Sequence, residues 1–301
     1  KSLGKRFKND IKWNKFMRKG IILSGGSGTR LYPLTGALSK QSLPIYDKPM
    51  IYYAMSVMLL AGIKDILIIS SPRDLNIFKE IFKHSKLLGL NIKFIAQKKP
   101  NGIAEAFILG EEFIGKDKVS LILGDNIFFG KDFQKILMKI SKLNQNYIFS
   151  YEVNNPDQYG IIKRDIKKIP KKIIEKPKKF ISNEAVTGLY FYTNEVIKIA
   201  KKLKPSKRGE LEITDINQIF LKKKQMQVYN LGRGFTWFDT GTPDSLLNAS
   251  SFVKSIQNRE PHLIACIEEI AYLKKFTNKR KLNKYLKLIP HANYKKYIQS
   301  I

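Results

Sequence analysis

The chain has 301 residues, which is enough for one large domain or two smaller ones with a well-buried core. With 43% hydrophobic and 27% charged residues, its composition is that of an ordinary globular protein. No apolar run reaches the roughly 18 uncharged residues of a membrane-spanning helix, and the first residues lack the apolar core of a secretory signal. We therefore expect a cytoplasmic protein without a membrane span, in which the single cysteine, Cys266, is a buried apolar side chain.

The formal net charge of +30 at first suggests a surface that binds nucleic acid. Residues 1–19 and 271–301 together carry +16 of this charge, and lysine outnumbers arginine by 46 to 9. Readout of base edges and phosphates relies strongly on the bidentate arginine side chain. We therefore expect loose attraction to polyanions and no specific nucleic-acid binding.

Strands and helices alternate from residue 20 to about residue 150. The pattern predicts strands at 20–23, 65–70, 92–97, 119–123 and 147–153. It predicts helices between them at 50–61, 75–87, 103–113 and 133–143. Because the strands are apolar throughout, we expect an α/β fold with a doubly wound, mostly parallel, Rossmann-like sheet that has helices on both faces. Ligands bind such sheets at the carboxyl ends of the strands.

The second half of the chain is less regular. A polar, lysine-rich segment at 161–174 predicts a hairpin or an excursion from the sheet, and further strands are predicted at 186–192, 227–231 and 235–238. Helices are predicted at 195–203, 211–221 and 243–256. We therefore expect three regions, which are a disordered extension at 1–16 before the first methionine, an α/β domain at 17–260 and a small helical segment at 261–301.

A glycine-rich loop, Gly25-Gly26-Ser27-Gly28-Thr29-Arg30, follows the first predicted strand. It matches neither a Walker A loop, because no lysine stands in the required place, nor a dinucleotide fingerprint, because Leu31 replaces the third glycine. Glycines allow backbone N–H groups to approach an oxyanion closely, and hydroxyl groups add further donors. Arg30 and Lys40 supply cations for phosphate. The simpler alternative is a plain glycine turn between a strand and a helix.

Two acidic residues follow apolar strands. Asp125 lies two positions after the end of the strand at 119–123, and Asp239 directly follows the strand at 235–238. An aspartate at such a position is usually a turn former or a helix cap. Carboxylates that face a phosphate site are also natural Mg²⁺ ligands, since Mg²⁺ takes one or two carboxylates together with substrate phosphates. The pair therefore predicts a shared metal site.

Further polar residues are weaker signals when each is taken alone. Lys176, in Glu175-Lys176-Pro177, is one of many lysines, and a solvated surface position is the simplest interpretation. Gln41 and Gln97 offer an amide donor beside an acceptor, which matches N3–H and the adjacent carbonyl of a pyrimidine. The three histidines lie in no motif, and we assign none of them to catalysis.

Taken together, these motifs resemble the sugar-phosphate nucleotidyltransferases. The resemblance extends over nearly all of residues 17–297 and includes the segments GGSGTRLYPLTGALSKQ, LGDNIFFG, EKP, AVTGLYFY, RGELEITDIN, FTWFDTGTPDSL and CIEEIA. The stretches SKQSLPIYDKPMIYY and RGELEITDIN favour the bacterial branch that transfers thymidylyl groups to glucose 1-phosphate.

The resemblance implies transfer of a thymidylyl group from dTTP to glucose 1-phosphate, giving dTDP-glucose and pyrophosphate for deoxysugar (such as dTDP-rhamnose) and surface polysaccharide synthesis. It implies Mg²⁺ as cofactor and a homotetramer. The implied catalytic residues are Arg30, Lys40, Lys176, Asp125 and Asp239, of which the two aspartates are also the metal ligands. The implied nucleotide-binding residues are Leu23, Gly25, Gly26, Ser27, Gly28, Thr29, Gln41, Gln97 and Gly102. The implied sugar-phosphate-binding residues are Asn126, Tyr159, Gly160, Glu175 and Val186.

Two alternatives remain open at this point. One is a nucleotidyltransferase that uses UTP or another nucleotide through the same loop. The other is a catalytically silent sugar-nucleotide-binding protein, whose expected sign is loss of Arg30, Asp125, Lys176 or Asp239; all four are present. Leu273 replaces an arginine that is common in relatives at a regulatory nucleotide site, which predicts weak feedback control.

Overall fold

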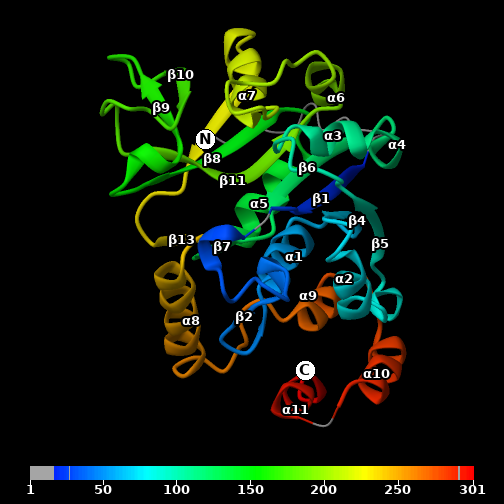
Figure 1. The fold of residues 1–301 in the computed structure, drawn as a ribbon. Coiled ribbons are helices and arrows are strands. Elements are labelled where there is room, and N and C mark those ends of the chain that lie inside the picture. The colour runs from blue at the N-terminus through cyan, green and yellow to red at the C-terminus, as the bar shows by residue number, and fades with distance from the viewer. Residues whose placement is uncertain (1–16, 27, 291) are drawn as a thin grey trace, which may run out of the picture.

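The computed structural model describes residues 17–26, 28–290 and 292–301. The extension that we expect at 1–16 lies outside these residues. Within the described part, a nine-stranded sheet has the order β10-β9-β11-β6-β1-β4-β5, with β8 beside β11 and β12 beside β8 (Figure 1). Its strands are β1 (Arg18–Ser24), β4 (Asp65–Ser70), β5 (Asn91–Ala96), β6 (Lys118–Leu123), β8 (Asn146–Glu152), β9 (Gly160–Arg164), β10 (Pro170–Glu175), β11 (Glu184–Tyr192) and β12 (Met226–Asn230).

The strands of the first half form the parallel part of the sheet. β1 pairs in parallel with β4 and with β6, and β4 pairs in parallel with β5. Neighbouring residues enter two separate cores, with Ile22 and Ile68 in one and Ile21 and Leu67 in the other, all fully buried. Because both faces of these strands are apolar, both need a cover of helices. The predicted doubly wound α/β fold is therefore confirmed.

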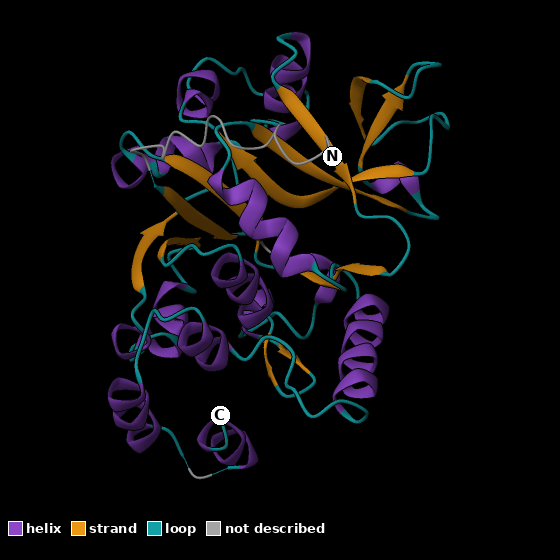
Figure 2. Cartoon of the chain, turned by 180° about the vertical axis from the view of Figure 1, so that it is seen from behind, coloured by secondary structure: helices purple, strands orange, loops and turns teal. Residues whose placement is uncertain are grey.

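Helices cover the sheet on both faces (Figures 1 and 2). The core on one face includes residues of α1 (Ile51–Leu60), α2 (Leu75–Ile81), α5 (Phe133–Lys142) and α9 (Ile267–Leu273). The core on the other face includes residues of α3 (Glu105–Leu109), α4 (Glu111–Ile114), α6 (Glu195–Ala200) and α7 (Ile213–Lys222). The remaining helices are α8 (Pro243–Gln257), α10 (Lys279–Leu288) and α11 (Asn293–Gln299).

Two predicted helices are shorter than their apolar patterns suggested. The pattern at 103–113 forms two helices, α3 and α4, which meet at Gly110. A side chain at Gly110 would lie 3.1 Å from Ile21 and 3.2 Å from Leu67, so close packing on the sheet explains the glycine. The pattern at 75–87 forms α2 and a separate 3-10 helix, Ser85–Leu88, which Gly89 ends with a φ of 74°.

The second half of the chain adds antiparallel strands to the sheet. β11 runs antiparallel to β6 and to β8, and β12 runs parallel to β8. The lysine-rich segment forms the predicted hairpin, in which β9 and β10 pair antiparallel. The sheet is therefore parallel over residues 18–123 and mixed beyond them.

Two short ribbons lie outside the main sheet. One joins β2 (Pro44–Ile45) to β3 (Lys48–Pro49). The other joins β7 (Asn126–Gly130) antiparallel to β13 (Phe235–Asp239) and places Asp239 opposite Asn126. The sequence analysis did not predict β7. This short strand begins only two residues after β6 ends, and no separate apolar pattern marks it.

Of the C-terminal helices, α9 packs against α1 and α10 packs against α9 and the 3-10 helix Ser85–Leu88, while α10 and α11 lie at the lower edge of the molecule in Figure 1. Cys266 is buried, as predicted, in the core that contains residues of α1. The buried carboxylate of Glu268 accepts hydrogen bonds from Tyr285 at 2.7 Å and Tyr294 at 2.6 Å, which links α9 to α10 and α11. The division of the chain at residue 260 stays a prediction. In the described part of the chain, no helix is long and apolar enough to cross a membrane.

Candidate active site

The glycine-rich loop lies directly after β1. Gly26 has a φ of 126° and Gly28 a φ of 60°, a backbone conformation that favours glycine. The Thr35 hydroxyl donates a hydrogen bond of 2.8 Å to the carbonyl of Gly28, which holds the loop against the segment that follows it. Ser27 is not among the described residues.

A cavity of 210 Å³, which we name the loop cavity, lies over the glycine-rich loop. Lys40 and Gln41 reach it from a 3-10 helix, Lys40–Ser42, and are only 8% and 3% exposed. Glycine backbone and two cations on one small cavity are suited to a phosphate group. Its lining residues are Gly25, Gly26, Gly28, Thr29, Arg30, Lys40, Gln41, Asp125 and Gly241, and all but Gly241 belong to the predicted site.

The β7–β13 ribbon brings the two predicted metal ligands together. Asp125 lies in the turn between β6 and β7, and Asp239 is the last residue of β13, opposite Asn126. The buried Thr240 donates to the carbonyl oxygen of Asp125 through its hydroxyl at 2.8 Å and its N–H at 3.2 Å. These bonds tie the end of β13 to the start of β7, so the two aspartates are held by backbone contacts.

The charge of Asp125 is stabilised by its neighbours. Burial by itself raises the pKa of this carboxyl group, but the Lys40 ammonium and the Asn126 amide outweigh burial, so its pKa lies below the usual value. Lys40 donates to Oδ2 of Asp125, and the Asn126 amide donates to Oδ1 at 3.1 Å. Asp125 is therefore ionised at neutral pH.

The pKa of Asp239 is shifted in the opposite direction, upward. Burial, together with the negative charge of Asp125, raises its pKa to about 6, and the cations of Lys40, Arg30 and Lys176 offset only part of this shift. Two carboxylates held close together in a partly buried site repel each other. A cation bound between them would relieve that repulsion.

The Asn126 side chain has a fixed orientation. Its Oδ1 accepts the indole N–H of Trp237 at 2.7 Å and the backbone N–H of Gly188 at 2.9 Å. A side chain at position 188 would lie 2.5 Å from Oδ1, so only glycine leaves room for this bond. The amide nitrogen of Asn126 must then face Asp125, since both contacts to Oδ1 come from donors.

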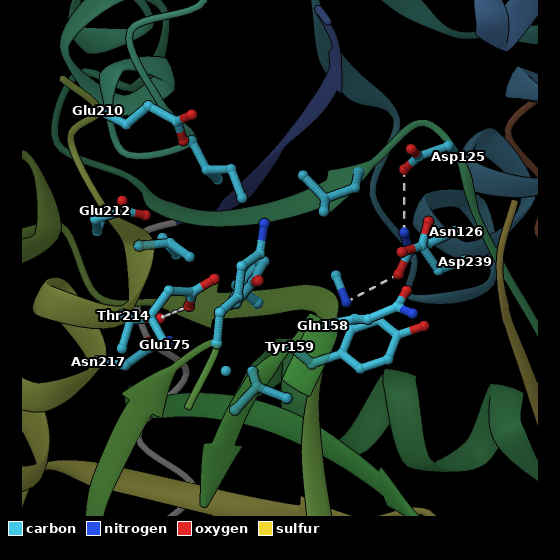
Figure 3. Close-up of a pocket in the computed structure, with 18 of the residues that line it drawn as sticks. Asp125, Asn126, Gln158, Tyr159, Glu175, Glu210, Glu212, Thr214, Asn217 and Asp239 are labelled. Carbon is cyan, nitrogen blue, oxygen red and sulfur yellow. Dashed lines mark hydrogen bonds between the residues drawn. The ribbon is translucent and has the colours of Figure 1, made fainter. Parts of the chain in front are cut away.

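A larger cavity of 630 Å³, which we name the large cavity, begins where the loop cavity ends. Figure 3 shows Asp125 and Asp239 at one end of it and Glu175 and Thr214 at the other. Arg30 and Asp125 line both cavities. Of the predicted residues, the large cavity is lined by Arg30, Asp125, Asn126, Tyr159, Gly160, Glu175, Lys176, Val186 and Asp239, which include the whole predicted sugar-phosphate set.

Lys176 follows β10 in an unusual backbone conformation. Its φ is 42°, and its N–H donates to the carbonyl of Tyr159 at 2.9 Å, which anchors the turn beside β9. The ring of Tyr159 packs against Trp237, with the ring centroids 5.2 Å apart. Glu175 accepts the Thr214 hydroxyl at 2.6 Å. Glu175 is therefore held by α7 and the Lys176 backbone by Tyr159, and Lys176 is an exposed residue.

Several residues of the large cavity were not predicted. Thr214 and Asn217 stand three positions apart on α7, so they share one helix face. Arg208 lies within 2.9 Å of Glu210 and 3.6 Å of Glu212, in the segment RGELEITDIN, which carried the resemblance but supplied no predicted site residue. The segment RGELEITDIN shows that these polar residues are close in sequence. Only the position of α7 shows that they face the large cavity. The other unpredicted lining residues are Ile103, Leu123, Asp157, Gln158, Gly188, Tyr190, Ile213, Trp237 and Thr242.

A third cavity of 290 Å³, the outer cavity, also borders the glycine-rich loop. It is lined by Gly25, Gly26, Ser71, Arg73, Asp74, Gln97, Lys98 and Pro100, of which the two glycines and Gln97 were predicted. Leu23 and Gly102, also predicted, line none of the three cavities. Leu23 is buried in β1, and Gly102 has a φ of 104° and packs against the backbone of Leu211.

The donor set around Asp125 and Asp239 suits a hard divalent cation. In the described part of the chain no three His, Cys, Asp or Glu side chains gather into a metal-binding group. Mg²⁺ does not need such a group, because it completes its shell with water and substrate phosphates. The observation that fits is that the β7–β13 ribbon holds two carboxylates side by side, where burial and the charge of Asp125 raise the pKa of Asp239.

Comparisons with known proteins agree with this geometry. The model of the family described as Nucleotidyl transferase matches residues 19–256. The glucose-1-phosphate thymidylyltransferase of Neisseria meningitidis is 48% identical over 281 residues, which cover 93% of this chain and 98% of the relative.

Solved structures give the same result. A Bacillus anthracis protein in complex with sucrose aligns with a TM-score of 0.71 and 36% identity, over 78% of this chain and 94% of that one. UDP-glucose pyrophosphorylase complexed with UDP-glucose aligns with a TM-score of 0.70 and 26% identity, over 81% of this chain and 100% of that one. The chain therefore belongs to the nucleotidyl transferase family, together with the glucose-1-phosphate thymidylyltransferases.

Proposed function

We propose that this chain transfers the thymidylyl group of dTTP to glucose 1-phosphate, releasing pyrophosphate and forming dTDP-glucose. The observation that supports this best is the junction of the loop cavity and the large cavity, whose common wall is Arg30 and Asp125. An enzyme that joins two phosphates needs two binding sites that meet at the reacting phosphorus. The 48% identity to a glucose-1-phosphate thymidylyltransferase supports the choice of substrates.

The reaction needs no general base from the protein. A phosphate monoester has a second pKa of about 6 and is largely dianionic at neutral pH, so glucose 1-phosphate is already a nucleophile. One of its oxygens attacks the α-phosphorus of dTTP in line, and the bond to the pyrophosphate oxygen breaks. Catalysis then consists of positioning the two substrates and stabilising charge.

The cations divide this task between the two cavities. Arg30 offers a planar fork that binds two phosphate oxygens, and Lys40 holds the departing pyrophosphate in the loop cavity. Lys176, an exposed residue that lines the large cavity, draws the sugar phosphate toward the α-phosphate. Each group stabilises charge that grows in the transition state, which is where a cation contributes most.

Asp125 and Asp239 would hold Mg²⁺, with phosphate oxygens completing its shell. When bound, this ion neutralises charge on the triphosphate and polarises the bond to the leaving group. The protein contributes two carboxylates fixed by the β7–β13 ribbon and by Thr240. Lys40, which pairs with Asp125 and lines the loop cavity, would hold pyrophosphate oxygens beside such an ion.

The polar residues of the large cavity are suited to sugar hydroxyl groups. Glu175 accepts one hydrogen bond from Thr214 and has further acceptor positions on its oxygens. Asn126, Tyr159, Gly160 and Val186 complete this side of the site. We assign the base and the deoxyribose to Gln97, Gln41 and the glycine-rich loop. Leu23 and Gly102, which line none of the three cavities, would hold these residues in place.

The proposal also covers the oligomeric state of the protein and its location in the cell. We propose a homotetramer in the cytoplasm, whose product feeds deoxysugar synthesis, such as that of dTDP-rhamnose, for surface polysaccharides. Light scattering after gel filtration tests the tetramer directly, and a monomeric enzyme at assay concentration contradicts it.

One assay tests the activity itself. Pyrophosphate release from glucose 1-phosphate is measured with dTTP, UTP, CTP, ATP and GTP, each with and without Mg²⁺. We expect the highest kcat/KM with dTTP, and turnover only with the metal. A preference for UTP would contradict thymidylyl transfer and support a uridylyl-transferring pyrophosphorylase. No turnover with any nucleotide would support a catalytically silent sugar-nucleotide-binding protein.

A further inference from the structure

Gln97 is a glutamine whose amide is held by a carboxylate. It directly follows β5, it is 6% exposed, and its Nε2 donates to Oε2 of Glu105 at 2.6 Å. The other carboxylate oxygen of Glu105 accepts the amide N–H of Asn101 at 2.8 Å. Glu105 is the first residue of α3 and lies outside all three cavities.

This contact determines which way the Gln97 amide is turned. A carboxylate only accepts hydrogen bonds, whereas an amide has a donor end and an acceptor end. If the amide were rotated by 180°, its carbonyl oxygen would face a carboxylate oxygen at the distance of a short hydrogen bond, and the two would repel each other. Nε2 must therefore face Glu105.

The carbonyl end of Gln97 consequently faces the substrate side. Oε1 lies over Gly25, because a Cβ built on that glycine would be only 2.6 Å from it. Gly25 and Gln97 both line the outer cavity. Among the residues that the structure describes, none donates a hydrogen bond to Oε1, so it is available as an acceptor.

We propose that Glu105 is a positioning residue that makes this site select thymine or uracil over cytosine. The inference rests on the proposed nucleotidyl transfer and on Gln97 as the residue that meets the base. Nε2 has two protons, and donation of one to Glu105 leaves the other beside Oε1. The amide therefore presents an acceptor and a donor in one fixed order.

The order of these groups distinguishes the pyrimidines. Thymine and uracil have a donor, N3–H, beside a carbonyl acceptor, which complements the amide as it is held. Cytosine has an acceptor at N3 beside an amino donor, which requires the amide in the reversed orientation. A cytosine base would therefore either leave the Gln97 edge unmatched or force the Gln97 carbonyl against Glu105.

The test replaces Glu105 by a side chain of the same shape that both donates and accepts. In Glu105→Gln the Gln97 amide is free to take either orientation, so the ratio of kcat/KM for dTTP to that for dCTP should fall about tenfold or more, mainly through KM. Glu112→Gln, on an exposed position of α4, is the matched control and should leave the ratio unchanged. Glu105→Asp should retain most of the preference, because aspartate also only accepts.

A double-mutant cycle separates this role from a structural one. In a Gln97→Ala background, Glu105→Gln should no longer change the ratio, because the amide through which it acts is gone. A further change there, or an unchanged ratio in the single variant, overturns the inference. If Glu105→Gln does not fold, Glu105→Ala, which also removes the acceptor, should lower the ratio in its place.

The outcome also separates this inference from the proposed function. A native protein that releases no pyrophosphate from dTTP contradicts the proposed function. An active protein that prefers dTTP to dCTP, but whose preference does not respond to Glu105→Gln, contradicts only the role of Glu105.

Discussion

Lys40 and Asp125, 85 positions apart in the chain, form an ion pair on the wall of the loop cavity. The lysine comes from a 3-10 helix after the glycine-rich loop, and the aspartate from the turn between β6 and β7. The contact joins the proposed phosphate site to the proposed metal site. Any change at one of these residues should therefore affect the other.

Replacing Lys40 by methionine tests this link. Lys40→Met keeps the length of the side chain but removes the charge, and we expect kcat to fall by about 10²–10³, the range for loss of one electrostatic donor to a transition state. The pKa of Asp125 should rise, because Lys40 is the main group that lowers it. Steady-state kinetics check the first effect, and titration of the carboxyl resonance checks the second.

Lys48→Met is the matched control. Lys48 is buried like Lys40 and pairs with Asp47 at 2.5 Å, but it lines none of the three cavities. It should lower stability and leave kcat nearly unchanged in the folded protein. Equal losses of kcat in the two variants would contradict a specific role for Lys40.

Replacing Asp239 should separate stability from activity. Burial and the charge of Asp125 raise the pKa of Asp239 to about 6, so Asp239→Asn should stabilise the ligand-free protein at pH 7.5 by roughly 1–3 kcal/mol. The same change removes a proposed metal ligand, so turnover should fall by about 10²-fold or more. Urea unfolding and the pyrophosphate assay measure the two effects.

A second aspartate provides the control for this prediction. Asp117→Asn removes an ion pair with Lys19 at the opposite end of β6 and β1, so it should lower stability slightly and leave turnover intact. Undiminished turnover in Asp239→Asn would exclude its metal role.

The ion pair between Arg164 and Glu184 should make stability depend on pH. Burial opposes ionisation of Glu184, but two contacts of 2.6 Å from Arg164 and one of 2.6 Å from Ser150 lower its pKa below its ordinary value of 4.5. Because the pKa is lower in the folded state, the stabilisation is fully present above pH 4.5 and is lost as the pH falls through the folded value.

Glu184→Gln should therefore destabilise the protein by about 1–3 kcal/mol at pH 7. The difference from the native chain should shrink steadily as the pH falls below 4.5, as denaturant unfolding at several pH values will measure. Glu111→Gln, in a pair whose side chains are 48% and 47% exposed, should have a smaller effect, because solvent screens that pair. A difference that grows in acid would contradict the assignment.

Leu273 leads to a prediction about feedback control. It is 66% exposed and lies on a separate cavity of 520 Å³ whose lining includes Asp132, Glu260 and Glu269. Lys135 and His262 also line this cavity, but the apolar side chain of Leu273 itself offers no donor to a diphosphate. We expect weak inhibition by the end-product sugar nucleotide, and Leu273→Arg should strengthen it about fivefold or more, as a charge-assisted hydrogen bond would. Potent non-competitive inhibition of the native chain would contradict this.

Local patterns in the sequence predicted most of the elements of this fold. Apolar runs predicted β1, β4, β5 and β6 to within two residues, because buried parallel strands need to be apolar on both faces. The same patterns missed the break at Gly110 and the strand β7. Both depend on what packs against the segment, which are the side chains of Ile21 and Leu67 in one case and the strand β13 in the other.

The residues of the candidate site also fall into two groups, those that the sequence reveals and those that only the tertiary structure reveals. Glycines, arginine and aspartates next to strand ends are visible in the sequence, since the backbone conformation and the chemistry they serve are local. Only the tertiary structure brings Asp239 opposite Asn126, pairs Lys40 with Asp125, and places Thr214 and Asn217 on the large cavity. It alone turns the Gln97 amide toward Glu105. Most of these relationships join residues far apart in the chain, and even Gln97 and Glu105, which are close in sequence, meet only because the fold places β5 beside the start of α3.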